Sequence, residues 1–210
     1  MWDFVDRIVY INLDHREDRR THMKSVFEKG KIPEEKLQRF PAVLFKPGII
    51  GCAKSHVAVL KMAKENDWNS ILILEDDIEW VNFEENYKKL EELSKTDYDV
   101  CVVSGAYIET KGIKVLKSYT TGAYIVKKHY YDKLIQCFEE SLNKLTAPAG
   151  FPFQKVDITS RVMNDHDNHF DVYWNRLQRA DNWIGIIPSM AKQINSYSDI
   201  LYKTYTPGTS

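Results

Sequence analysis

Residues Ile71 to Trp80 read ILILEDDIEW, four apolar residues followed directly by three acidic ones. A short, continuous apolar run of this kind is typical of a strand buried on both faces, as in a parallel sheet. Carboxylates this close repel one another, and each loses hydration where the strand is buried. The residues alone leave two interpretations open: a divalent cation beside Glu75 to Asp77, or an acidic cap of a following helix.

The composition limits the classes of protein that fit. The chain has 210 residues, 43% of them hydrophobic, and a formal net charge of −1. This balance predicts a folded core and gives no general attraction to nucleic acid. Its three cysteines follow no zinc or disulfide spacing, and no apolar run approaches the ~20 residues of a membrane helix. Without a visible signal peptide, we expect a cytoplasmic protein, in the host cytoplasm if the source is viral.

Apolar strands alternate with amphipathic helices along the chain. Strands are expected at residues 7–13, 40–43, 71–74, 100–104, 122–126 and 183–187, and helices after Asp14 and at residues 51–64, 83–93, 129–140 and 171–179. This order predicts a mostly parallel α/β sheet flanked by helices. We expect one domain over residues 1–205, a loop or lid at residues 144–170 and a frayed tail at residues 206–210.

The position of the acids matters more than their spacing. In open α/β sheets, ligands bind beyond the carboxyl ends of the strands, where Glu75 and Asp77 lie. Alternation in an extended segment places both side chains on one face, where they suit Mn²⁺ or Mg²⁺. The pair in Asp97-Tyr98-Asp99 has the same spacing but precedes its strand, at the opposite edge. The pair in Asp165-His166-Asp167 lies in the polar loop.

The first strand leads into Asn12-Leu13-Asp14-His15-Arg16-Glu17-Asp18-Arg19-Arg20. A helix that begins at the carboxyl end of a strand can bind an anion, and Arg16, Arg19 or Arg20 could grip a phosphate. The alternative is a solvated helix start with local ion pairs. The chain contains neither a Gly-x-Gly-x-x-Gly motif nor a phosphate loop, which argues against ordinary dinucleotide and kinase-type sites.

Five blocks together resemble glycosyltransferase family 25, which includes bacterial lipopolysaccharide β-galactosyltransferases, procollagen galactosyltransferases and relatives from large DNA viruses. They occur in the family's order between residues 9 and 200. The blocks are VYINLDHREDRR (9–20), GCAKSHVAVLKMA (51–63), ILILEDDI (71–78), TTGAYIV (120–126) and PSMAKQINSYSDI (188–200).

The resemblance implies a GT-A fold and a UDP-sugar donor, usually UDP-galactose. It also implies a divalent metal, a glycan or glycoprotein acceptor, and inversion at the anomeric carbon. Glu75 and Asp77 then match the positions that face ribose and metal, and we place Asp76 on the donor side. The other expected donor-binding residues are Asn12, Leu13, Arg16, Ser55, His56, Gln193, Ser198 and Asp199. His56 lies on the apolar face of its helix, so a core histidine is an equal alternative.

The sequence departs from many GT-A enzymes because no histidine follows His169. Gln193, Asp199 or water would then complete the metal site. His166 and His169 could also hold a metal, but two histidines three apart in a polar loop are more often simply solvated. For the catalytic base we prefer Asp171 to Asp157, because Tyr173 and Trp174 follow it and suit a sugar face. A helix cap is the alternative role of Asp171. Two other classes remain open: another metal-dependent phosphoester enzyme, and a non-catalytic carbohydrate- or nucleotide-binding relative.

Overall fold

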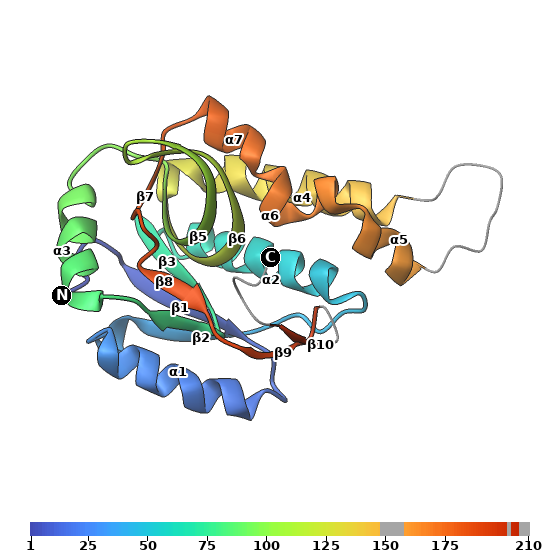
Figure 1. The fold of residues 1–210 in the computed structure, drawn as a ribbon, viewed down its shortest axis with the longest axis horizontal. Helices are drawn as coiled ribbons and strands as arrows, with labels where there is room; N and C mark the ends of the chain where they lie inside the picture. Colours follow the sequence, from blue (N-terminus) through green and yellow to red (C-terminus); the bar gives the residue numbers. More distant parts are fainter. Residues whose placement is uncertain (148–157, 201–202, 206–210) are drawn as a thin grey trace.

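The computed structural model describes residues 1–147, 158–200 and 203–205 (Figure 1). The expected tail at residues 206–210 lies outside the described residues, as does Asp157. No helix in the described ranges is both long enough and apolar enough to cross a bilayer.

A six-stranded sheet forms the centre of the fold, in the order β2-β1-β3-β6-β5-β7. The parallel pairs are β1–β2, β1–β3 and β5–β7, and β6 is antiparallel to both β3 and β5. Five of the six strands therefore point the same way, which confirms the predicted mostly parallel α/β sheet. The strands are β1 (Arg7–Asn12), β2 (Leu37–Pro41), β3 (Ser70–Glu75), β5 (Val100–Lys111), β6 (Lys114–Lys127) and β7 (Trp183–Gly185).

Helices cover both faces of the sheet (Figure 1). Side chains alternate along β3, so Leu72 and Leu74 pack with residues of α1 and α3, whereas Ile71 and Ile73 pack with residues of α2 and α4. This two-sided burial explains why the strand reads as a continuous apolar run. The helices are α1 (Glu17–Lys29), α2 (Gly48–Glu65), α3 (Phe83–Leu93) and α4 (Tyr131–Thr146).

Strands β5 and β6 are much longer than the predicted segments 100–104 and 122–126. Their outer halves form a ribbon that turns at Gly112, whose φ of 60° is in the left-handed region that glycine tolerates. Register shifts interrupt the pairing, and the ribbon curls above the sheet (Figure 1). Its residues are mostly polar and partly exposed, so no apolar run marks them in the sequence.

The prediction of a loop at residues 144–170 is wrong for residues 158–170. That segment contains α5 (Ile158–Asn164) and the 3₁₀ helix η3 (His166–Asn168). The fully buried side chain of Val162 anchors α5 to the core. Arg161 also donates hydrogen bonds to the carbonyl oxygens of Leu145 and Ala147, at 2.8 Å and 2.5 Å, and so closes the end of α4. Val162 and Arg161 thus help to hold the segment in place.

The single helix expected at residues 171–179 is split into α6 (Phe170–Tyr173) and α7 (Asn175–Ala180). Between them, the indole nitrogen of Trp174 donates to the Ser118 carbonyl oxygen at 3.0 Å. Beyond β7, strand β8 (Ala191–Gln193) pairs with β4 (Ile78–Trp80), and β9 (Ser196–Ser198) pairs with β10 (Lys203–Tyr205). The β4–β8 register sets Ile78 opposite Gln193, which brings the C-terminal block to the acidic triplet. The short 3₁₀ helices are η1 (Glu34–Lys36) and η2 (Lys128–Tyr130).

Candidate active site

A cavity of about 340 Å³ lies beyond the carboxyl ends of β1 and β3. The carboxyl edge of an α/β sheet is where ligands bind in such folds. Ten of the residues expected to form the site line this cavity, although they come from five separate parts of the sequence. They are Leu13, Ser55, His56, Glu75, Asp76, Asp77, Asp171, Gln193, Ser198 and Asp199.

Glu75 is the last residue of β3 and the centre of a polar network. Its Oε1 accepts a hydrogen bond from the Thr121 hydroxyl at 2.6 Å and lies 3.5 Å from Nε2 of His56. Its Oε2 accepts a bond from Nε2 of Gln193 at 3.3 Å. Burial disfavours the charged carboxylate, but His56 and Thr121 outweigh that effect and lower the pKa of Glu75. These contacts hold an ionised carboxylate at the edge of the cavity.

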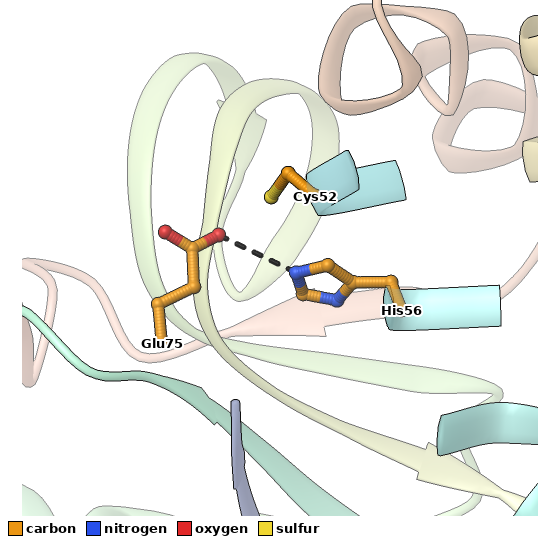
Figure 2. Close-up of side chains that lie close together, drawn as sticks. All are labelled: Cys52, His56 and Glu75. Atoms are coloured by element: carbon orange, nitrogen blue, oxygen red, sulfur yellow. Dashed lines mark ion pairs between the residues drawn. The ribbon is translucent and has the colours of Figure 1, made fainter. Parts of the chain in front are cut away.

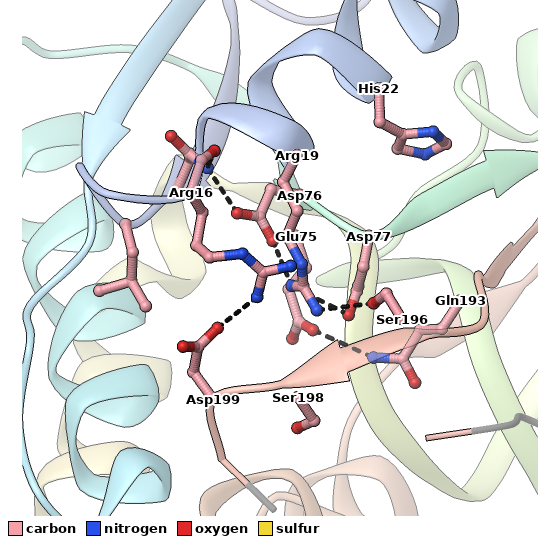
Figure 3. A network of polar contacts seen from close by, with 12 residues as sticks. Arg16, Arg19, His22, Glu75, Asp76, Asp77, Gln193, Ser196, Ser198 and Asp199 are labelled. Carbon is pink, nitrogen blue, oxygen red and sulfur yellow. Dashed lines mark hydrogen bonds and ion pairs between the residues drawn. The ribbon is translucent and has the colours of Figure 1, made fainter. Parts of the chain in front are cut away.

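Asp76 and Asp77 are tied to the start of α1 (Figure 3). Asp76 accepts hydrogen bonds from Nδ2 of Asn12 at 2.6 Å and from Nη1 of Arg19 at 2.5 Å. Nη1 of Arg19 also lies 3.2 Å from Asp77. The segment after Glu75 is a turn into β4, so these acids cap no helix and that alternative is wrong.

Asp77 has unsatisfied bonding capacity. Its Oδ1 is buried and has no hydrogen-bond partner among the described residues. Burial, together with the neighbouring Glu75 carboxylate, raises the pKa of Asp77 to about 7. A buried carboxylate oxygen without a partner is costly unless a proton or a cation reaches it. Asp77 is therefore the acid of the triplet best prepared to receive a cation.

The charges around the cavity also fit a hard divalent ion. Among the described lining residues, five carboxylates face a single guanidinium, that of Arg19. Glu75 and Asp77 supply the oxygen donors that Mn²⁺ and Mg²⁺ prefer, while Asp76 is already engaged by Asn12 and Arg19. Glu75 and Asp77 are thus the two residues that could hold the metal.

Arg16 is one of the expected donor-binding residues, but its side chain does not line the cavity. The guanidinium is engaged by Asp18, by Asp199 and by the carbonyl oxygen of Tyr197, at 3.0 Å from Nη1. The hydrogen bonds from Arg16 lower the pKa of Asp18 to about 2. Arg16 thus fixes the segment that carries Asp199, and Arg19 is the arginine that faces the cavity.

Asn12 is also set back from the cavity. Its side chain is buried, donates to Asp76, and accepts a hydrogen bond from Nε of Arg39 at 3.1 Å. It connects β1 to the acidic triplet and thereby positions Asp76. Ser198 lines the cavity, and its hydroxyl accepts a bond from the Ile200 amide at 3.3 Å.

Ser55 and His56 lie on α2 and are both fully buried. The Ser55 hydroxyl donates to the Gly51 carbonyl oxygen and accepts from the Val43 amide, both at 2.8 Å, so it fastens the preceding loop to the helix. Nδ1 of His56 lies 2.8 Å from the Tyr124 hydroxyl. Its other nitrogen faces Glu75, so one side of the ring belongs to the core and the other to the cavity.

Cys52 joins His56 and Glu75 in a compact group (Figure 2). One ligand atom from each residue lies within 4.8 Å of the others, which makes the group a possible metal-binding cluster. Burial and the nearby carboxylate of Glu75 raise the pKa of the Cys52 thiol. The four-residue spacing of Cys52 and His56 places both on one helix face and is visible in the sequence.

Asp171 lines the cavity from the start of α6. Its Oδ2 accepts a hydrogen bond from the Thr120 amide at 3.3 Å, and burial raises its pKa. The capping position of α6 is occupied by His169. The expected aromatic platform is wrong: Trp174 is fully buried against Phe138 and Trp183, and neither Tyr173 nor Trp174 lines the cavity.

His166 and His169 both line the cavity, and their ring centroids are 5.1 Å apart. Nε2 of His169 lies 2.9 Å from the Val162 carbonyl oxygen, so this nitrogen is engaged in holding α5. Sequence reasoning also missed Leu44 and Phe45, which reach the rim of the cavity and are exposed by 73% and 39%. No periodic pattern marks them, because they lie in the loop before α2.

The chain resembles known proteins in both sequence and fold. The profile of the family described as "Glycosyltransferase family 25 (LPS biosynthesis protein)" matches residues 45–148. The protein named "Putative glycosyltransferase" of Haemophilus influenzae (strain ATCC 51907 / DSM 11121 / KW20 / Rd) is 33% identical, over 44% of this chain and 39% of that protein. "Putative glycosyltransferase R655" of Acanthamoeba polyphaga mimivirus is 34% identical, over 42% of this chain and 32% of that protein. The matched region thus spans less than two fifths of each of these two relatives.

The fold also occurs in a solved structure, "a glycosyltransferase involved in the glycosylation of the major capsid of PBCV-1". The superposition has a TM-score of 0.54 at 11% identity and covers 93% of this chain and 96% of that chain. At this identity the likeness concerns the fold, and it confirms the expected GT-A-type architecture.

Proposed function

Because this chain belongs to glycosyltransferase family 25, we propose that it transfers a hexose, with galactose as our first choice, from a UDP-sugar to an acceptor hydroxyl. The acceptor would be a glycan or a glycosylated protein. The observation that carries the proposal is the single cavity that gathers Glu75, Asp77, Asp171, Gln193 and Asp199 at the carboxyl edge of the sheet.

The donor diphosphate would bind near Arg19. Nη1 and Nη2 of this arginine connect the acidic triplet to Ser196 and the Tyr197 carbonyl oxygen in β9, and its buried Nε has no hydrogen-bond partner within the described part of the chain. A guanidinium can bind phosphate through two parallel hydrogen bonds. Arg16 would act indirectly, by holding Asp199 and β9 in place.

Glu75 and Asp77 would hold a Mn²⁺ or Mg²⁺ ion. When bound, such an ion stabilises the negative charge that develops on a diphosphate leaving group. Asn12 and Arg19 keep Asp76 directed away from this role, and Gln193 orients Glu75. The protein's own contribution is to hold two carboxylates on one face of the cavity before the donor arrives.

Asp171 would be the general base of an inverting transfer. The acceptor oxygen attacks the anomeric carbon, the bond from that carbon to the diphosphate oxygen breaks, and the hydroxyl proton passes to Asp171. A raised pKa improves a carboxylate as a proton acceptor. The Thr120 amide donates to Oδ2 of Asp171 and so holds the side chain in place.

A panel of UDP-sugars with Mn²⁺ tests the function directly, with UDP release and acceptor glycosylation as readouts. We expect UDP release to require Mn²⁺ and to be fastest with UDP-galactose when a hydroxyl acceptor is present. Hydrolysis of simple phosphoesters without sugar transfer would instead indicate a phosphoester enzyme. Binding of UDP-sugars without turnover on any acceptor would indicate a non-catalytic relative.

A further inference from the structure

Three side chains of different chemistry converge at one point of the cavity wall: a thiol, an imidazole and a carboxylate. Cys52 and His56 project from the same face of α2, and Glu75 meets them from the end of β3 (Figure 2). All three residues line the cavity, and their ligand atoms lie within 4.8 Å of one another.

The distances are close to those of a tetrahedral zinc site. Zinc ligands of nitrogen and oxygen lie about 2.0–2.1 Å from the ion, so two of them are separated by about 3.4 Å. Nε2 of His56 and Oε1 of Glu75 are 3.5 Å apart. The sulfur of Cys52 is within 4.8 Å of both, so it must move by only about 1 Å to complete the face of a tetrahedron.

The environment of His56 is an independent sign of a ligand. The side chain is fully buried, and its Nε2 has no hydrogen-bond partner among the described residues although it faces Cys52 and Glu75. Nδ1 is held by the Tyr124 hydroxyl at 2.8 Å. Metal-bound histidines have this arrangement, in which an outer partner fixes one ring nitrogen and leaves the other for the ion.

We propose that Cys52, His56 and Glu75 form a zinc site whose fourth position opens into the cavity. Thiolate and imidazole ligands favour Zn²⁺ over Mn²⁺ or Mg²⁺, which prefer oxygen. Three protein ligands with one open position are typical of exchangeable or catalytic zinc, whereas structural sites are closed by four. Binding forms a sulfur–zinc bond and releases the thiol proton of Cys52 to solvent.

Glu75 would then be a ligand that two different ions, Zn²⁺ and Mn²⁺, compete for. This consequence rests on the proposed function. Zinc held by Cys52 and His56 takes the carboxylate that the Mn²⁺ of the transfer reaction needs. Zinc would therefore inhibit the enzyme competitively with Mn²⁺. Binding of zinc itself does not require that the protein be a glycosyltransferase.

Cobalt(II) is a suitable probe because its thiolate complexes give a charge-transfer absorption that zinc lacks. We expect the metal-free protein to bind one Co²⁺ with this absorption, and one equivalent of Zn²⁺ to abolish it. Cys52→Ala should remove the absorption, whereas Cys101→Ala, a change at a buried cysteine outside the cavity, should keep it. Tyr124→Phe should weaken Co²⁺ binding about 10-fold to 100-fold.

An absorption that persists in Cys52→Ala, or that is absent from the wild type, would overturn the proposal. Maleimide labelling followed by mass spectrometry tests the zinc site in the wild type without any variant, because Zn²⁺ should protect Cys52 from the reagent. Equal labelling of Cys52 with and without Zn²⁺ would also overturn the proposal. UDP-sugar turnover separates the two proposals: active protein without a cobalt site would refute only the zinc site, and a cobalt site without turnover would refute only the transferase.

Discussion

Two acidic motifs of matching spacing lie at opposite edges of the same sheet. Glu75-Asp76-Asp77 follows β3 and lines the cavity, and Oδ1 of Asp77 has no hydrogen-bond partner among the described residues. Asp97-Tyr98-Asp99 precedes β5. There, Asp99 accepts a bond from the Asn182 amide at 2.9 Å and lies 2.8 Å from Nε2 of His129, while the Asp97 side chain is exposed.

The difference shows that an acid-any-acid pair does not by itself make a metal site. At the amino edge, local donors satisfy Asp99 and solvent surrounds Asp97. At the carboxyl edge, strand geometry collects more carboxylates than the neighbouring cations neutralise. That surplus of negative charge distinguishes the cavity, and four substitution experiments probe it.

The largest effect should come from Asp171→Asn, which keeps the shape of the side chain and removes its basicity. We expect turnover to fall about 10²-fold to 10⁴-fold, the usual contribution of a general base, with binding of UDP and Mn²⁺ preserved. Steady-state kinetics and calorimetry measure the two quantities. Asp167→Asn, in the same segment but outside the cavity lining, is the matched control. Turnover within a few-fold of wild type would place the base elsewhere and make Asp157→Asn the next test.

Substitutions of Arg16 and Arg19, the two arginines near the start of α1, should differ in their effects. Arg19→Gln should raise the Michaelis constant for the donor about 10-fold to 100-fold, because a hydrogen bond to a charged group contributes about 1.5–3 kcal/mol. Turnover should change less, since the contact precedes the reaction. Arg16→Gln should have a smaller effect, because its side chain does not line the cavity. If Arg16→Gln raised the Michaelis constant for the donor more than Arg19→Gln did, Arg16 would be the residue that contacts the diphosphate.

A smaller effect concerns stability without metal. An acid whose pKa is about 7 in the fold and near 3.8 when unfolded binds more protons in the folded state between these values. The free energy of unfolding should therefore fall as pH rises from about 4 to about 7. Asp77→Asn should remove this loss, so its advantage over wild type should grow across that range in urea unfolding. Asp97→Asn should stay within about 0.5 kcal/mol of wild type. If the difference in free energy of unfolding between Asp77→Asn and wild type stayed constant across this pH range, the fold would not raise the pKa of Asp77.

The sequence predicted the parts of the fold that have a strong local signal. The strand at 71–74 is a continuous apolar run because both of its faces are buried, the strand at 7–13 is a short β-rich run, and the acids after Leu74 fall at the expected edge. The sheet type and the family resemblance were therefore within reach of the residues alone. The family profile matches residues 45–148, which contain the three central blocks of the five.

Features that depend on contacts between residues far apart in the sequence could not be predicted from local sequence patterns. Strands β8 and β9 have three residues each and form only because β4 and β10 pair with them. Trp174 followed an acid and suggested a sugar platform, but the packing of α4 and β7 around it places it in the core. The choice between Arg16 and Arg19 depends on the position of β9, which the sequence of the turn does not contain.

The most direct test of the account is calorimetric binding of UDP with and without Mn²⁺ in wild type, Asp77→Asn and Asp97→Asn. We expect Mn²⁺ to strengthen UDP binding in wild type and in Asp97→Asn, and Asp77→Asn to lose that gain while keeping its folded circular dichroism spectrum, because the lost carboxylate is a metal ligand. Equal Mn²⁺ dependence in all three proteins would contradict the account and would move the metal away from the carboxyl end of β3.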